Sequence, residues 1–267
     1  MTDQTPGPGP DHDLRATAAA LADAARAAVL PHFRTDIAAE NKAAAGFDPV
    51  TAADRAAETA IRDMLARLRP DDAVLGEELG RAAGTSGLTW VIDPIDGTRA
   101  FLSGAPTWGV LIALCDADGP RHGVIDQPHI GERWEGGIGA ATLTGPRGVR
   151  PLATRPPRSL DSAILFSTFP EIGTAAERDA FARVAGRARL TRYGLDCYAY
   201  GLLAAGQIDL VIEAGLQPYD ICAPIAVIAA AGGVVTTWDG GPAHGGGRIL
   251  AAANREIHAE AMALLAG

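Results

Sequence analysis

Positive charge and cysteine are both scarce in this sequence. Lys42 is the only lysine, and 23 lysines and arginines stand against 32 acidic residues, for a formal net charge of −9. A general nucleic-acid binder needs a basic surface for phosphate contacts, so this charge argues against that class. It does not exclude an anionic substrate, because bound metal ions can invert the local field. The three cysteines are widely spaced and form neither a zinc motif nor a disulfide framework, which favours buried thiols in a reducing compartment.

Long apolar runs are also lacking. No run approaches the roughly 18 residues that a membrane span requires, so no membrane partner is expected. The first ten residues are rich in proline and glycine. They have neither the basic region nor the apolar region of a signal peptide. We therefore expect residues 1–12 to form a disordered tail and the protein to be cytoplasmic. Hydrophobic residues make up 48% of the chain, which is enough to bury the core of an ordinary globular protein.

Apolar periodicity in the first half predicts two helices followed by a sheet. The first helix is expected at 13–33, with Asp13 as its N-cap. The second is expected at 51–68, and Pro70 prevents it from continuing further. Short apolar runs separated by turn residues then predict a mainly antiparallel sheet. Its expected strands are 73–75, 90–92, 109–115, 123–126 and 138–143.

Beyond about residue 150 the pattern alternates between strands and helices, which is typical of an α/β architecture. The expected strands are 163–166, 189–192, 209–213, 234–237 and 248–251. The expected helices are 175–185, 197–205, 225–231 and 255–265. We therefore expect an α+β half at 13–150 that carries the metal-binding motifs and an α/β half at 151–267. The two halves should pack as a single catalytic unit.

The most informative stretch is 90–98, where an apolar strand ends and two carboxylates follow. Asp93 and Asp96 flank Pro94, which fixes the backbone and removes one donor, so that the Ile95 carbonyl can point inward. Two carboxylates and a carbonyl suit a hard cation such as Mg²⁺. Taken alone, the same residues would fit an ordinary turn with aspartate as the cap.

The next residues, Gly97 and Thr98, are suited to binding a phosphate group. Gly97 permits close approach of the backbone, and Thr98 begins a short helix whose first N–H groups lack partners. Other acids lie near the ends of predicted elements. Each has a simpler reading when taken singly: Glu77 belongs to a surface acidic pair, Asp220 is a helix N-cap, and Asp54 is part of a capping box.

Four elements together resemble the inositol monophosphatase superfamily. They are Asp48-Pro49-Val50-Thr51-Ala52-Ala53-Asp54, Gly76-Glu77-Glu78, Asp93-Pro94-Ile95-Asp96-Gly97-Thr98, and Tyr219-Asp220 leading to Gly232-Gly233. Their order and spacing follow the family over nearly the whole sequence after the tail. The resemblance implies a layered α-β-α-β-α sandwich of mixed α and β structure, a homodimer, and a phosphatase that uses two or three Mg²⁺ ions per site.

The resemblance also implies roles for single residues. The metal ligands would be Glu77, Asp93, the Ile95 carbonyl, Asp96 and Asp220. The phosphate binders would be Lys42, Asp96, Gly97 and Thr98. Asp54 and Thr98 would orient the attacking water, and Glu77 would complete the catalytic group.

Within the superfamily, the chain looks most like the bacterial histidinol-phosphate phosphatases. The residues that carry this likeness are 123–128, 131–134, 192–200 and 213–220. Histidinol phosphate carries an ammonium group and an imidazole, so further carboxylates near the leaving group would suit it. The expected substrate-binding residues are Arg192, Asp196, Glu213 and Asp220.

Alternatives remain open at this stage. A polyol also binds carboxylate acceptors, so the chain could be an inositol-1-monophosphatase or a 3′(2′),5′-bisphosphate nucleotidase. A remote alternative is a non-catalytic regulator on the same fold. The sequence departs from the family at Leu195 and Gln217, where glycine and lysine are usual. It departs again at Pro224, where a helix is expected to start; all three departures concern the pocket and not the metal site.

Overall fold

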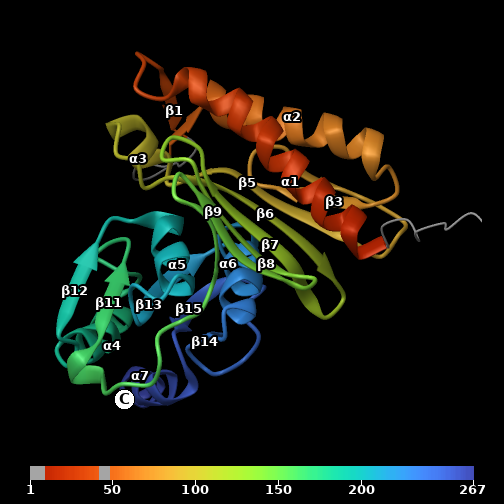
Figure 1. Ribbon diagram of the computed structural model, residues 1–267. Coiled ribbons are helices and arrows are strands. Elements are labelled where there is room, and N and C mark those ends of the chain that lie inside the picture. The colour runs from red at the N-terminus through yellow and green to blue at the C-terminus, as the bar shows by residue number, and fades with distance from the viewer. Residues whose placement is uncertain (1–9, 42–48) are drawn as a thin grey trace, which may run out of the picture.

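Two long helices cover one face of the larger sheet in the first half of the chain (Figure 1). The computed structural model describes residues 10–41 and 49–267. Helix α1 spans Pro10–Val29 and continues as a 3₁₀ turn at Leu30–His32, and α2 spans Ala52–Leu68. Two short strands, β1 (Ala39–Asn41) and β2 (Pro49–Thr51), pair antiparallel just before α2.

The ends of these helices follow from local chemistry. Helix α1 begins three residues before the predicted cap Asp13, because proline at position 10 fits the first turn of a helix. Asp13 instead lies in the first turn, where its charge favours the helix dipole. The helix ends before the predicted residue 33, since Pro31 cannot donate a helical hydrogen bond. Helix α2 starts as predicted, with Thr51 as its N-cap.

The larger sheet has eight strands in the order β10-β9-β8-β7-β6-β5-β3-β4. Only the β3–β5 pair is parallel, which confirms the predicted mainly antiparallel sheet. The predicted strand 138–143 begins later, because Ile138 has a φ of +48° in the turn before β9. Strand β8 has no sequence prediction, since five of its six residues are charged or glycine. The strand bounds are β3 Ala73–Gly76, β4 Gly80–Ala82, β5 Thr89–Asp96, β6 Gly109–Asp116, β7 Gly119–Gln127, β8 Glu132–Gly137, β9 Ala140–Gly145 and β10 Gly148–Pro151.

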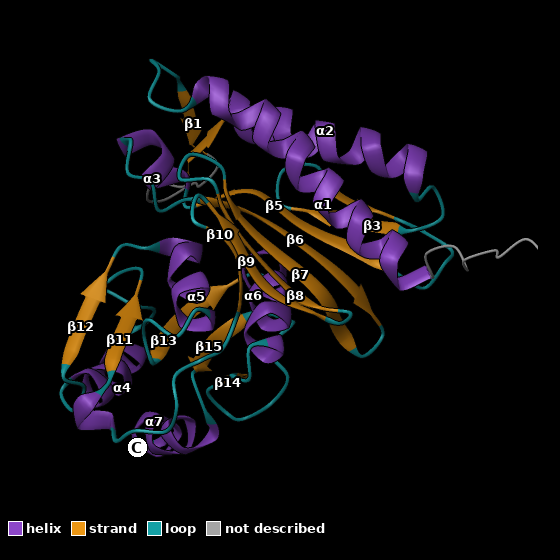
Figure 2. Cartoon of the chain, in the orientation of Figure 1, coloured by secondary structure: helices purple, strands orange, loops and turns teal. Residues whose placement is uncertain are grey.

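The second sheet has five strands in the order β12-β11-β13-β15-β14, and β11 runs parallel to both of its neighbours. Helices α5 and α6 lie between the two sheets, while α4 and α7 cover the outer face of the second (Figure 2). This arrangement confirms the predicted α-β-α-β-α sandwich. The bounds are β11 Ile164–Ser167, α4 Ala175–Ala185, β12 Leu190–Tyr193, α5 Asp196–Ala204, β13 Leu210–Leu216, α6 Pro218–Ala230, β14 Val234–Thr237, β15 Gly247–Ala252 and α7 Arg255–Ala266, with a 3₁₀ turn at Leu160–Ser162.

Helix α6 starts seven residues before the predicted residue 225. Pro218 is tolerated as the first helical residue, and Gln217 and Asp220 form a capping box. Asp220 is therefore the third residue of the helix and not its N-cap. Pro224 lies inside the helix and not at its start, where it removes the helical donor to the Asp220 carbonyl.

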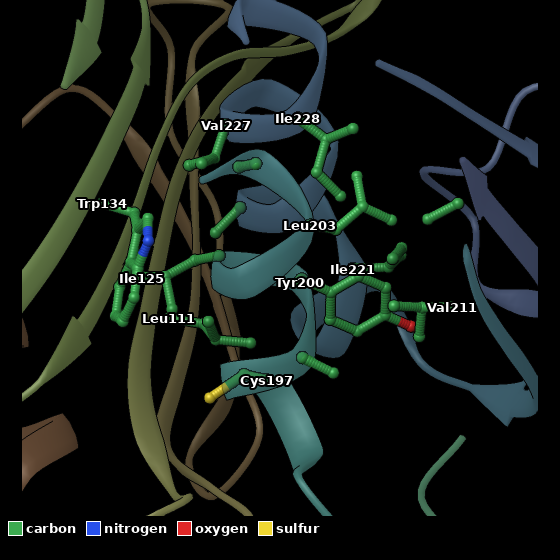
Figure 3. Packing of buried hydrophobic residues seen from close by; sticks show 14 of the residues in the cluster. Leu111, Ile125, Trp134, Cys197, Tyr200, Leu203, Val211, Ile221, Val227 and Ile228 are labelled. Atoms are coloured by element: carbon green, nitrogen blue, oxygen red, sulfur yellow. The ribbon is translucent and has the colours of Figure 1, made fainter. Parts of the chain in front are cut away.

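The central core packs α5 and α6 against the larger sheet. Glycines allow the close approach: a Cβ added to Gly123 would lie 2.4 Å from the Ala223 carbonyl oxygen, and one on Gly136 would lie 2.4 Å from the Val227 Cα. Figure 3 shows the sheet residues Leu111, Ile125 and Trp134 facing a group from the helices and the second sheet: Cys197, Tyr200, Leu203, Val211, Ile221, Val227 and Ile228. This packing fixes the first turns of α5 and α6 beside the end of β5. Among the described residues, no helix combines the length and apolar character needed to cross a membrane.

Candidate active site

A bulge at the end of β5 places two carboxylates on one side of the sheet. Asp93 pairs with Leu111 and Asp96 with Gly109, so three steps along β5 match two along β6. Side chains alternate along a regular strand, so residues three apart would otherwise point to opposite faces. The extra residue removes that difference, and Pro94 is tolerated there because a bulge needs no ladder donor.

Carboxylates from two halves of the chain converge beside this bulge. Oxygen atoms of Asp93, Asp96 and Asp220 all lie within 4.8 Å of one another. Burial, followed by the charges of Glu77 and the other two aspartates, raises the pKa of Asp93 well above its usual range. Burial and the neighbouring carboxylates likewise raise the pKa of Asp96. Three carboxylates this close together are stable in their ionised form only when a cation is bound between them.

Backbone N–H groups orient each of these three carboxylates. Asp93 Oδ1 accepts a hydrogen bond from the amide of Ile95 at 3.0 Å. Asp96 Oδ2 accepts one from Cys197, in the first turn of α5, at 2.6 Å. Asp220 Oδ2 accepts one from Gln217 at 2.7 Å. The side chains are therefore fixed by the fold before any ion binds, which preorganises the cluster.

Glu77 is positioned by a residue that the sequence does not single out. Glu58 of α2 is fully buried, and its carboxylate accepts hydrogen bonds from the amides of Glu78 at 2.8 Å and Leu79 at 3.2 Å. The guanidinium of Arg62 adds a contact at 2.7 Å. A Cβ on Gly76 would lie 2.0 Å from a Glu58 oxygen, so only glycine fits there. The available signal was the Glu58–Arg62 spacing of four, but that spacing does not say which loop the pair holds.

Asp54 is fully buried near Glu77 and does not itself line the cavity that holds the other predicted site residues. Its Oδ2 accepts hydrogen bonds from the amide and hydroxyl of Thr51, at 2.8 and 2.6 Å, so the capping-box reading is correct. Its Oδ1 is buried and has no hydrogen-bond partner. Burial, and to a lesser extent the charge of Glu77, raises the pKa of Asp54. An unpaired buried acceptor beside an acidic cluster fits a bound cation with its water molecules.

The residues after the bulge form the predicted phosphate end. Gly97 has a φ of +85°, and a Cβ on it would lie 2.8 Å from the Asp196 side chain. Thr98 begins α3 (Thr98–Ser103), and its hydroxyl donates to the Ile95 carbonyl at 3.2 Å. Lys42, the remaining predicted phosphate binder, lies outside the described residues.

These groups share one cavity of about 460 Å³ between the two halves of the chain. The predicted residues that line it are Glu77, Asp93, Ile95, Asp96, Gly97, Thr98, Asp196, Glu213 and Asp220. Arg192 does not line it; this residue is exposed on the edge strand β12. The cavity also includes residues to which no role was predicted, among them Arg99, Thr168, Phe169, Tyr200, Gln217 and Tyr219. Of these, Arg99 directly follows the acidic motif, Tyr200, Gln217 and Tyr219 lie in the stretches that carry the family likeness, and Thr168 and Phe169 had no signal in the sequence.

Two further carboxylates, Asp196 and Glu213, line the same cavity as the metal cluster. Glu213 of β13 accepts hydrogen bonds from the amide and hydroxyl of Thr168, at 2.6 and 2.9 Å. Burial raises the pKa of Glu213 to about 7, against the effect of these donors. Burial also raises the pKa of Asp196 to about 6, although Thr107 and Arg99 oppose the shift. Both groups therefore favour a cationic ligand group that would keep them ionised.

The profile of the inositol monophosphatase family matches residues 11–266, almost the whole chain. The chain belongs to the inositol monophosphatase family. The bifunctional phosphatase IMPL2 of Arabidopsis thaliana is 39% identical over 90% of this chain and 69% of its own. The histidinol-phosphatase of Mycobacterium tuberculosis is 36% identical over 95% and 98%. The solved structure of an inositol monophosphatase from Zymomonas mobilis is 35% identical, covers 97% and 100%, and superposes with a TM-score of 0.86.

Membership of the inositol monophosphatase family gives the acidic cluster its chemical meaning. Members are metal-dependent phosphatases, typically with Mg²⁺, that act on small phosphomonoesters. The donor set here is all oxygen, which is the set that Mg²⁺ prefers. The chain is therefore a phosphatase whose acidic cluster can hold metal, and the residues present fit that ion.

Proposed function

We propose that this chain is a Mg²⁺-dependent histidinol-phosphate phosphatase of histidine biosynthesis, which converts L-histidinol phosphate and water to L-histidinol and phosphate. The observation that carries the proposal is the pair of carboxylates, Asp196 and Glu213, in the same cavity as the metal cluster. A leaving group with an ammonium and an imidazole would find two acceptors there. The similarity to the Mycobacterium tuberculosis relative, which is named as a histidinol-phosphatase, supports the same substrate.

The acidic cluster would hold two or three Mg²⁺ ions through Glu77, Asp93, the Ile95 carbonyl, Asp96 and Asp220. When bound, such ions lower the pKa of a coordinated water and neutralise charge on the phosphate and the leaving oxygen. Hydrogen bonds from backbone amides keep Asp93, Asp96 and Asp220 in place before the substrate arrives, so little reorganisation is needed on binding.

The remaining steps belong to the residues around the cluster. Asp54, with Thr98 and Glu77 as partners, would orient the attacking water, and the unpaired Oδ1 of Asp54 can accept a hydrogen bond from it. The amides of Gly97 and Thr98, together with Lys42, would hold the phosphate oxygens. With the phosphate held at the cluster, the leaving group would extend into the rest of the cavity, which Asp196 and Glu213 also line.

The second candidate is an inositol-1-monophosphatase. Glu213 could equally accept hydrogen bonds from a cyclitol, and the similar structure from Zymomonas mobilis is an inositol monophosphatase. A homodimer and a cytoplasmic location remain further parts of the proposal. They follow from the family resemblance and from the sequence, respectively.

A phosphate-release screen separates the candidates. It compares histidinol phosphate, inositol 1-phosphate and adenosine 3′,5′-bisphosphate, each with and without Mg²⁺. We expect Mg²⁺-dependent release with the highest kcat/KM on histidinol phosphate. A clear preference for either other substrate would contradict the proposal.

A substitution in the cavity wall sharpens this screen. Asp196→Ala removes a hydrogen-bond acceptor that carries charge, so kcat/KM for histidinol phosphate should fall about 10- to 100-fold, and that for inositol 1-phosphate much less. Asp179→Ala, which removes an exposed carboxylate of α4, is the matched control and should change neither. Equal losses on both substrates in Asp196→Ala would remove the substrate assignment.

A further inference from the structure

An aromatic side chain and an arginine meet at the rim of the cavity. Phe169 follows β11 in the second half of the chain, and Arg99 lies on α3 in the first. The guanidinium carbon of Arg99 lies 5.0 Å from the centre of the Phe169 ring. Phe169 remains 44% exposed, and both residues line the cavity. A large apolar side chain that is exposed inside a catalytic cavity is a candidate for contact with a ligand.

The arginine shows what kind of group this ring accepts. A guanidinium is a flat, delocalised cation, and its position over the ring is a cation–π contact. An imidazolium ring has the same flatness and the same charge, and neutral imidazole can still stack on an aromatic ring. The Arg99–Phe169 contact therefore represents the geometry that an imidazole could adopt on this ring.

The backbone next to the ring is tied to Glu213, a carboxylate that also lines the cavity. Phe169 directly follows Thr168, whose amide and hydroxyl both donate to Glu213. Ser167 adds a third, longer contact to the same carboxylate at 3.4 Å. The cavity wall therefore combines a flat apolar surface with a charged acceptor at a set spacing. A cyclitol, which presents hydroxyl groups around its whole edge, would use the acceptor and gain little from the ring.

We propose that Phe169 is a specificity-determining residue, whose ring stacks on the imidazole of histidinol phosphate and selects this substrate over ring-free or polyol phosphates. This inference rests on the proposed function and extends it to the residue that recognises the leaving group. Imidazole would bind either in the place of the Arg99 guanidinium or on the other part of the exposed ring.

The test is the ratio of kcat/KM for histidinol phosphate to kcat/KM for inositol 1-phosphate. Phe169→Leu keeps an apolar side chain but removes the aromatic face, so this ratio should fall about two- to tenfold, mainly through a higher KM for histidinol phosphate. Phe169→Trp keeps an aromatic face and should retain most of the ratio. Tyr193→Leu is the matched control, because it removes an exposed aromatic ring of β12 that does not line the cavity.

The outcomes separate this inference from the function on which it rests. A fall in the ratio for Phe169→Leu, with retention in Phe169→Trp and in Tyr193→Leu, supports the stacking role. If the unaltered protein hydrolyses histidinol phosphate and Phe169→Leu leaves the ratio unchanged, the inference is overturned and the proposed function stands. If the unaltered protein releases no phosphate from histidinol phosphate, the proposed function itself fails, and the stacking role fails with it.

Discussion

Replacement of Gly97 by alanine should impair both folding and catalysis, whereas alanine at a glycine of the same conformation outside the site should impair folding alone. Gly97 has a φ of +85°, a conformation that costs an alanine about 1 kcal/mol. Its new Cβ would also lie 2.8 Å from Asp196 Cγ and 2.9 Å from Asp196 Cβ, so a neighbour must move. Overpacking of this kind costs about 1–3 kcal/mol. This movement would displace Asp196 from the cavity wall. It would also shift the Gly97 backbone, which should hold the phosphate.

A second glycine separates the two effects. Gly87 has nearly the same φ, +83°, but a Cβ on it meets nothing within 4 Å. Gly87→Ala should therefore lower the free energy of unfolding by about 1 kcal/mol and leave phosphate release unchanged. Gly97→Ala should lose about 2–4 kcal/mol of stability and at least tenfold in kcat/KM.

The assay combines urea unfolding, followed by circular dichroism in the presence of Mg²⁺, with steady-state phosphate release at a temperature where both variants are folded. Equal kcat/KM values for Gly97→Ala and Gly87→Ala would show that the close approach of Gly97 to Asp196 has no part in catalysis.

Other residues of the site give further predictions. Asp93→Asn should abolish Mg²⁺ binding by calorimetry, and in chelator at about pH 8 it should raise the free energy of unfolding by about 1 kcal/mol or more, because it removes one of several like charges. A lower stability than the unaltered protein under those conditions would contradict the repulsion. The pKa of Glu213 is raised to about 7 in the folded protein, so the metal-free protein should lose stability as pH rises from about 4.5 to 7, and Glu213→Gln should flatten that slope in urea titrations. An unchanged slope would show that Glu213 is not responsible. Glu58→Gln should lower the free energy of unfolding by about 2 kcal/mol and weaken Mg²⁺ binding, since it loosens the turn that carries Glu77. Unchanged Mg²⁺ affinity in that variant would remove Glu58 as a positioning residue.

Regular elements could be read from the sequence where local signals agreed. Helix α2 combines an apolar face, a threonine cap and a stopping proline, so its start and end match the prediction. Strands of the larger sheet with strong apolar runs, such as β6, were also predicted. Strand β8 was not, because three of its six residues are charged and two are glycine, so it lacks the apolar run that signals a strand.

Helix α6 shows the limit of a local rule. Pro224 suggested a helix start, but packing of α6 against Gly123 and Gly136 holds the helix together around the proline. Tertiary contacts of this kind outweigh a local preference that amounts to a few kcal/mol.

The acidic cluster could be predicted because a motif names its members, but its geometry could not. The bulge that brings Asp93 and Asp96 to one face depends on pairing with β6, which no local pattern reveals. Glu58 and Phe169 belong to no motif, and their roles depend on contacts between distant segments. For Arg192 the sequence likeness suggested a substrate contact, whereas the fold leaves the residue exposed on an edge strand.

We expect the carboxylates of Glu77, Asp93, Asp96 and Asp220 to hold the divalent cations that catalysis requires. The most direct test measures phosphate release from histidinol phosphate after chelator treatment and dialysis, followed by titration with Mg²⁺. We expect no phosphate release from the chelator-treated protein and full recovery of release as Mg²⁺ is added. Release that continues undiminished in excess chelator would contradict this expectation.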